Sequence, residues 1–189
     1  PHGRGGMRGD VLVYSIDGAD TIAGVDANWR SFAEDNCWRS SCGPEEVVGR
    51  LLWDFIQDYE TRHLYQELFR RLRDGRRCPP LPFRCDSPSE RRFLELALNP
   101  LPEGGIELRS RTVRSERREP VPLLEAGTPR SGDSITICSM CKKIRVAEER
   151  WAEIEEGLVL LRIFEAEAMP WLSHGLCPAC YRSAVENMD

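Results

Sequence analysis

Long apolar segments are missing from this 189-residue chain. Its most apolar stretch, 157–161, is five residues long and is followed by Arg162, whereas a helix that crosses a bilayer needs about 20 apolar residues. This excludes membrane insertion. Residues 1–9 are rich in Gly and Arg and contain no apolar segment of the kind a secretory signal requires. We therefore expect a cytoplasmic protein.

Recognisable catalytic motifs are also missing. No G-x-G motif followed by a helix occurs after residue 120, so we do not expect a nucleotide-binding domain of the kind a histidine kinase needs. A length of 189 residues suits one ordinary domain and a smaller module, so we do not expect a large multidomain enzyme. We expect a protein that is not an enzyme.

Charge is present in both signs and is unevenly distributed. The 26 basic and 31 acidic side chains give a net charge of −5, and the mean hydropathy is −0.45, as expected for a soluble globular chain. Only residues 61–120 carry a basic excess, and there the arginines alternate with glutamates. The sequence contains no recognisable nucleic-acid-reading module, so it argues against nucleic acid as the partner.

The apolar pattern of the first 119 residues predicts two strands, then helices, then three strands. Alternation and turn signals predict strands at 11–16, 21–25, 81–86, 91–99 and 105–118. Helical spacing predicts a helix after Asp26, a short helix from Pro44 and a long helix over 59–74. The last three strands are joined by short turns and should form an antiparallel meander.

Residues 120–134 contain five Pro and Gly residues between 120 and 132, a composition typical of a linker. This predicts a domain over 10–119, a linker over 120–134 and a second module over 135–189. In the second module, Trp151, Ile154, Leu158 and Leu161 recur at helical spacing. They predict a helix that folds back over the module.

The order of elements and several short motifs resemble a PAS domain with its terminal PAC-type strands. The matching motifs are Asp26-x2-Trp29-x2-Phe32-Ala33-x2-Asn36, Val48-Gly49-Arg50-x2-Trp53, Leu64-Tyr65, and Pro82-Phe-Arg-Cys-Asp-Ser-Pro88 with Arg91-Arg92. The resemblance implies an α+β fold: a five-stranded antiparallel sheet with helices on one face and a small interior. It also implies a sensing or dimerising role.

That interior is either a packed core or a cavity for a small ligand of unknown identity. The residues that we expect to line it are Trp29, Phe32, Trp53, Phe69 and Cys85. Alternation along 83–86 places Cys85 on the opposite face from Arg84 and Asp86, and Asp86 is expected to pair with Arg91 or Arg92. Haem and flavin are disfavoured, because His63 should point to solvent and no cysteine lies in a flavin-reactive motif.

Two C-x2-C pairs are the most specific feature of the sequence. Cys138 and Cys141 are separated by 35 residues from Cys177 and Cys180. Each pair can place two thiolates on one ion, and four sulfur donors favour zinc or an iron centre. We favour a structural zinc with all four cysteines as ligands and His174 beside the site.

Three alternatives stay open: a site of three cysteines and His174, a dithiol redox couple, and an iron or iron–sulfur centre. The arrangement C-x2-C-Lys, a Trp-x2-Ile segment and His-Gly-x-Cys-Pro-x-Cys also resembles a cysteine-rich module that follows PAS domains in bacterial sensor kinases and response regulators. That resemblance informs architecture more than activity.

The leading hypothesis is a bacterial signal-transduction module, in which the PAS domain receives a ligand, redox or partner signal and the zinc module relays it. We expect a homodimer or another protein partner. The alternatives are a nucleic-acid-binding regulator that uses a zinc ribbon and the arginines of 109–118, and an iron-containing redox sensor.

Metal analysis and an absorption spectrum of the purified protein test these hypotheses together. We expect one zinc ion per chain and no visible absorption band, because Zn²⁺ has a filled d shell. Stoichiometric iron with a visible band would contradict the zinc interpretation.

Overall fold

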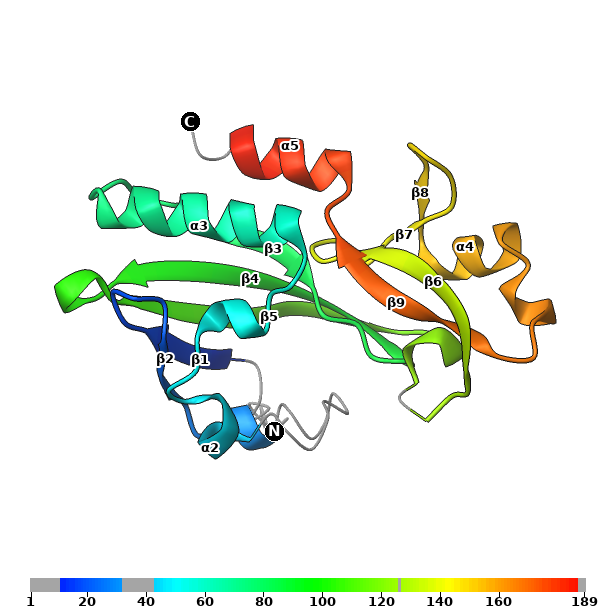
Figure 1. Ribbon diagram of the computed structural model, residues 1–189, viewed down its shortest axis with the longest axis horizontal. Helices are drawn as coiled ribbons and strands as arrows, with labels where there is room; N and C mark the ends of the chain where they lie inside the picture. Colours follow the sequence, from blue (N-terminus) through cyan, green and yellow to red (C-terminus); the bar gives the residue numbers. More distant parts are fainter. Residues whose placement is uncertain (1–10, 32–42, 126, 187–189) are drawn as a thin grey trace, which may run out of the picture.

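The computed structural model describes residues 11–31, 43–125 and 127–186. Its main sheet has five antiparallel strands in the order β2-β1-β5-β4-β3 (Figure 1). The strands are β1 (Val11–Ile16), β2 (Ile22–Val25), β3 (Leu81–Arg84), β4 (Glu90–Pro100) and β5 (Ile106–Arg117). This confirms the predicted α+β, PAS-like fold. Among the described helices, none has the length and apolarity needed to cross a membrane.

The register of the central strands separates a buried face from a charged face. Leu94, Leu96 and Leu98 of β4 are buried, and the alternate residue Glu95 lies opposite Arg111 of β5 and forms an ion pair with it. Side chains alternate between the two faces of a strand. The sheet therefore turns its leucines towards the helices and its ion pairs outward.

The helices cover the leucine face. They are α2 (Pro44–Val47), the 3-10 turn η1 (Leu52–Asp54) and α3 (Tyr59–Arg73). Asp58 caps α3 by accepting a hydrogen bond from the backbone N–H of Thr61 at 2.8 Å, as side chains at this position do. Leu64, Leu68 and Phe69 are each 1% exposed. His63 is exposed and stacks on Tyr59, which confirms its predicted orientation.

A second, four-stranded sheet has the order β8-β7-β6-β9, with β6 and β9 parallel. Its strands are β6 (Arg130–Cys138), β7 (Ile144–Arg145), β8 (Trp151–Ala152) and β9 (Met169–Gly175). The helices of this unit are α4 (Ile154–Leu160) and α5 (Pro178–Glu186), and its short 3-10 turns are η3 (Pro122–Leu124) and η4 (Ile163–Glu165). A further 3-10 turn, η2 (Pro102–Gly104), connects β4 with β5 in the main sheet. Trp151 lies in β8, so the helix that we predicted from Trp151 begins only at Ile154.

The segment predicted as a linker is structured. It contains η3, and β6 already begins at Arg130. Val121 is 3% exposed and Leu123 is fully buried in a core that also contains Ile144, Ile154 and Leu158. Proline and glycine made this segment look like a spacer, but Val121 and Leu123 are buried in the second core, and Leu124 packs against it.

The main unit, residues 11–119, and the second unit, residues 120–186, share a core at one end. Along β6, Ile137 packs into the second core, whereas its neighbour Cys138 packs into the main core, because successive side chains of a strand point to opposite faces. Leu176, Cys177 and Ala184 join the same main core as Leu64 and Leu68, and α5 lies over α3 (Figure 1). The second unit is therefore not self-contained.

We predict that Leu123→Ala destabilises the second unit by about 2–5 kcal/mol, because it leaves a cavity in a packed core. Urea unfolding followed by circular dichroism measures this change. Leu160→Ala is the matched control, since Leu160 is 45% exposed, and we expect it to change stability by less than about 1 kcal/mol. Equal effects of the two substitutions would contradict the assignment of 120–134 to the core.

Candidate metal centre and ligand cavity

The four predicted cysteines converge. The Sγ atoms of Cys138, Cys141, Cys177 and Cys180 all lie within 4.8 Å of one another. Cys138 ends β6, Cys141 lies in the turn before β7, Cys177 follows β9 and Cys180 lies in the first turn of α5. The parallel pairing of β6 with β9, which places Cys138 opposite Gly175, brings the two pairs to the same end of the sheet.

The donor set fits a tetrahedral metal. A tetrahedron with zinc–sulfur bonds of about 2.3 Å has edges of about 3.8 Å, and the Sγ atoms of Cys141 and Cys177 are 3.8 Å apart. The backbone N–H of Cys177 donates to the sulfur of Cys138, and that of Cys180 donates to the sulfur of Cys177, both at 3.4 Å. Such bonds stabilise thiolates that ligate a metal.

The thiols cannot all ionise without a cation. Hydrogen bonds from the Cys141 and Cys180 thiols lower the pKa of Cys138, whereas interaction with Cys138 and Cys141 raises the pKa of Cys180 far above its usual range. One thiolate therefore suppresses the next, and a divalent cation would remove this conflict. Among the described residues, His174 does not belong to the four-ligand group. It lies on β9 opposite Ile137.

The turn 138–141, which we call the first knuckle, contacts the main sheet and its long helix. Arg84 of β3 donates its backbone N–H to the carbonyl of Met140 at 2.7 Å. The hydroxyl of Ser139 donates to Asp58, the cap of α3, at 3.3 Å. Because β3 is an edge strand, its outer hydrogen-bonding groups are free to accept this neighbour.

Partly buried ion pairs join the same two units. Asp86, whose side chain is 1% exposed, pairs with Arg84 and Arg118. Arg84 also pairs with Glu153 of the second unit at 2.7 Å, and Glu155 pairs with Arg91 at 2.7 Å. We refer to these six residues, completed by the Arg118–Glu155 pair, as the ion cluster.

The partner that we predicted for Asp86 was wrong. Arg91 instead reaches Glu155, and Arg92 donates to the carbonyl of Cys85. Arg84 and Asp86 share one face of the chain, as predicted, so they can pair with each other, and Arg118 lies beside them just after β5. The sequence could not show that the second unit adds its own carboxylates here.

An apolar cavity of about 220 Å³ lies between the main sheet and its helices. Trp29 and Cys85 line it, as predicted. Trp53 and Phe69 do not line it: their rings pack together at a centroid distance of 5.8 Å, and the Trp53 indole donates to Asp20 at 3.0 Å. Phe32 lies outside the described residues. The interior therefore combines a packed core with a cavity.

Three hydroxyl groups line this apolar cavity, from Tyr14, Tyr65 and Ser110. Burial raises the pKa of Tyr65 to about 12 and raises that of Tyr14 further, so both phenols stay protonated and can donate hydrogen bonds. Sequence reasoning missed these residues. Ser110 could have been found, since it occupies an inward position in the alternating strand β5.

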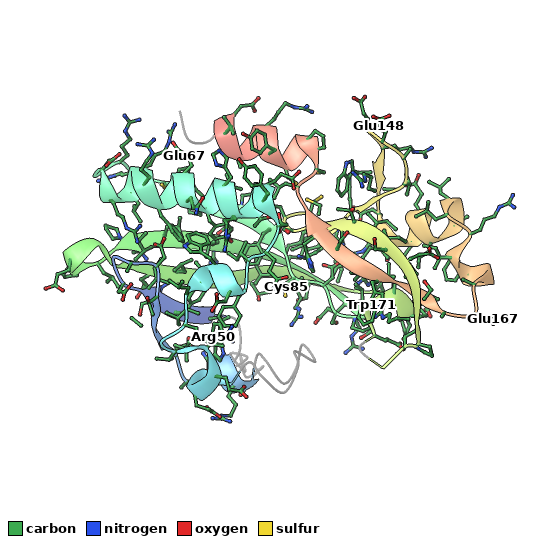
Figure 2. The ribbon with its side chains drawn as sticks, viewed as in Figure 1. Arg50, Glu67, Cys85, Glu148, Glu167 and Trp171 are labelled. Carbon is green, nitrogen blue, oxygen red and sulfur yellow. The ribbon has the colours of Figure 1, made fainter. Side chains whose placement is uncertain are left out.

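Cys85 lies where the cavity meets the second unit, and Figure 2 labels it at this junction. Its side chain lines the cavity, while Arg84 and Asp86 on either side of it belong to the ion cluster. Burial raises the pKa of its thiol, whereas the charges of Arg92 and Lys142 act in the opposite direction. Lys142, next to the candidate metal ligand Cys141, is therefore electrostatically coupled to a cavity residue. Burial lowers the pKa of this lysine.

Comparison with known proteins adds little to this description. No protein family model and no curated protein matches the chain. A domain of an HTR-like protein from Haloarcula marismortui is 15% identical, with a TM-score of 0.34 over 55% of this chain and 98% of that chain. The photoactive yellow protein domain of the sensor histidine kinase Ppr from Rhodospirillum centenum is 14% identical, with a TM-score of 0.36 over 54% and 84%. The PAS-like character of the chain rests on its own strand order.

We predict that Cys138→Ser abolishes stoichiometric metal binding and destabilises both units in one transition, because Cys138 belongs to the main core as well as to the thiolate group. Metal analysis and thermal unfolding measure the two effects. Cys78→Ser is the matched control, since Cys78 is a half-buried thiol outside the group, and it should keep the metal. A variant that loses the metal while the unfolding of 11–119 stays unchanged would contradict the shared core.

Proposed function

We propose that this protein is a non-catalytic signal-transduction module. In this proposal a small ligand enters the cavity, and its presence changes how the first knuckle and the second unit sit against β3. The metal fixes the conformation in which the first knuckle contacts β3. Zinc is the metal that the four thiolates favour, because all four tetrahedral positions are taken by sulfur and none is left for water.

The proposal rests on a difference between the two faces of β3 and of the two residues that follow it, Cys85 and Asp86. Phe83 and Cys85 line the cavity, whereas Arg84 and Asp86 hold the ion cluster. The backbone N–H of Arg84 meets the first knuckle directly. A ligand that displaces Cys85 by a small amount must therefore move groups that contact the second unit, because neighbouring residues of a strand are rigidly linked.

We also propose that the output goes to another protein chain, as a homodimer or with a separate partner in a bacterial two-component pathway. The resemblance of both units to parts of bacterial sensor proteins supports this. The pairing of the β5 arginines counts against a nucleic-acid-binding role, because Arg109, Arg111 and Arg114 each contact a glutamate and so offer less free charge to phosphates.

Hydrogen exchange with a series of straight-chain alcohols of four to eight carbons tests the relay. We expect the tightest-binding alcohol to slow exchange in β3 and also in residues 138–145, because β3 contacts the first knuckle. Glu153→Gln/Glu155→Gln should at least halve the response of 138–145 and leave that of β3 unchanged, since it removes the ion pairs between the units.

The double variant Glu148→Gln/Glu149→Gln is the matched control, because both of its side chains are exposed, and it should respond like the unaltered protein. An alcohol that protects β3 but leaves 138–145 unchanged in the unaltered protein would refute the relay.

A further inference from the structure

A second hollow, which we call the junction groove, lies between the main unit and the second unit. Its volume is about 650 Å³. The N-terminal end of α3, β3, the turn after the first knuckle and β9 contribute to its walls, and its polar side chains include Thr61, Ser139, Lys142 and His174. The proposed function makes no use of these polar groups.

The junction groove and the apolar cavity share a wall. Phe55, Ile56, Tyr65, Phe83 and Cys85 line both hollows. A residue that lines two hollows separates them by the thickness of a single side chain, and none of these five is fully buried. The hollows therefore meet at a single layer of side chains, most of which are partly buried.

Lys142 lines the junction groove and places a positive charge near the wall that the two hollows share. The sequence contains only two lysines, Lys142 and Lys143. Lys142 has a φ of 61°, a backbone conformation that costs an ordinary residue about 1 kcal/mol and favours glycine. Its ammonium group donates to the carbonyl of Ser139 at 2.9 Å. Within the described ranges, this ammonium has no carboxylate within 4.0 Å, whereas many of the arginines do.

Several groups around Lys142 can add hydrogen bonds to a ligand, and the carboxylate of Asp86, which also acts on Lys142, is already paired with Arg84 and Arg118. Thr61 is 6% exposed, and its hydroxyl has no hydrogen-bond partner in the part of the chain that is described. Burial and the charge of Lys142 lower the pKa of His174, which favours a neutral imidazole. Asp58 also lines the groove. Its carboxylate already accepts hydrogen bonds from the backbone N–H of Thr61 and from the hydroxyl of Ser139.

We propose that the cavity and the junction groove together bind a small amphipathic carboxylate. Its apolar body occupies the cavity, and its carboxylate lies in the groove and accepts hydrogen bonds from the ammonium of Lys142. This inference rests on the proposed function and names the class of ligand. An apolar molecule without charge would leave the ammonium of Lys142 without a carboxylate in direct contact, and a doubly charged anion would meet the carboxylate of Asp58.

This binding mode would connect the ligand directly to the metal centre. Lys142 follows the ligand residue Cys141, and its backbone N–H donates to the carbonyl of Cys138 at 3.0 Å. A carboxylate that holds the Lys142 side chain therefore also holds the turn that positions two of the four sulfurs. The ligand would then act on the first knuckle through Lys142 as well as through β3.

Binding of matched ligand pairs to the metal-loaded full chain tests the inference. The probes are straight-chain carboxylates of four to ten carbons and the primary alcohols of the same length, measured by isothermal titration calorimetry. We expect the best carboxylate to bind about tenfold to a hundredfold more tightly than its alcohol, because a hydrogen bond to a charged group is worth that much.

Lys142→Met should bring this ratio close to one while leaving alcohol binding unchanged. Lys143→Met is the matched control, since Lys143 lies beside the cysteines on another surface depression, and it should keep the full preference. Lys142→Gly is the second variant, because glycine suits the positive φ at this position. Metal content is measured for all variants, and only variants that keep the metal are compared.

Lysine labelling gives an independent readout. In a protein labelled with ¹³C and ¹⁵N lysine, only two side chains give signals. Carboxylate addition should shift the resonances of the Lys142 ammonium group and leave those of Lys143 in place, and the matched alcohol should shift the Lys142 ammonium resonances much less.

Alcohols that bind as tightly as carboxylates, or a preference that survives in Lys142→Gly, would overturn this inference and leave the cavity proposal standing. If no member of either series bound, the ligand-sensing proposal would fail with it.

Discussion

The convergence of four sulfurs on one point determines how the two units of this protein meet. Cys138 and Cys141 lie 36 or more residues from Cys177 in sequence, yet the Sγ atoms of all four cysteines lie within 4.8 Å of one another. The turn that carries the first pair is hydrogen-bonded to β3 through Met140 and to Asp58, the cap of α3, through Ser139. Four thiols that oppose each other's ionisation cannot hold this arrangement as charged groups, so a bound divalent cation is the natural source of its stability. Because the thiolate group is continuous with the main core, the same cation would support both units.

The ion cluster gives the junction specificity at an energetic cost. Asp86, Arg84 and Arg118 are nearly inaccessible to solvent, and charges taken out of water lose hydration that pairing only partly restores. Apolar residues of the same volume could hold the units together as well or better. A network in which Asp86 and Glu155 each meet two guanidinium groups and Glu153 meets one, however, accepts only one relative placement of the units. This precision suits a junction that has to report small movements of β3.

The second unit adds polar side chains beside the apolar cavity of the main unit. The apolar cavity lies between the sheet and its helices, while Lys142 and His174 come from the second unit. Charge selection at the groove would therefore depend on the second unit being docked. Removal of the metal would then affect ligand selectivity as well as stability, because Lys142 is held in place by the same turn that holds Cys138 and Cys141.

The sequence by itself determined the strands of the main sheet, its long helix and the four candidate metal ligands. Alternating leucines specified β4, the apolar stripe and Asp58 specified α3, and the C-x2-C spacing specified the four ligands, since these are local patterns that depend only on backbone periodicity and chelation geometry. Only the tertiary structure decided where residues distant in sequence meet. It paired Asp86 with Arg118, buried Leu123 in a segment that its prolines made look like a spacer, and placed Lys142 beside the wall of the cavity. These outcomes depend on the packing of two units against each other, which no local pattern encodes, because the free energy of such contacts comes from burial and charge pairing across the whole fold.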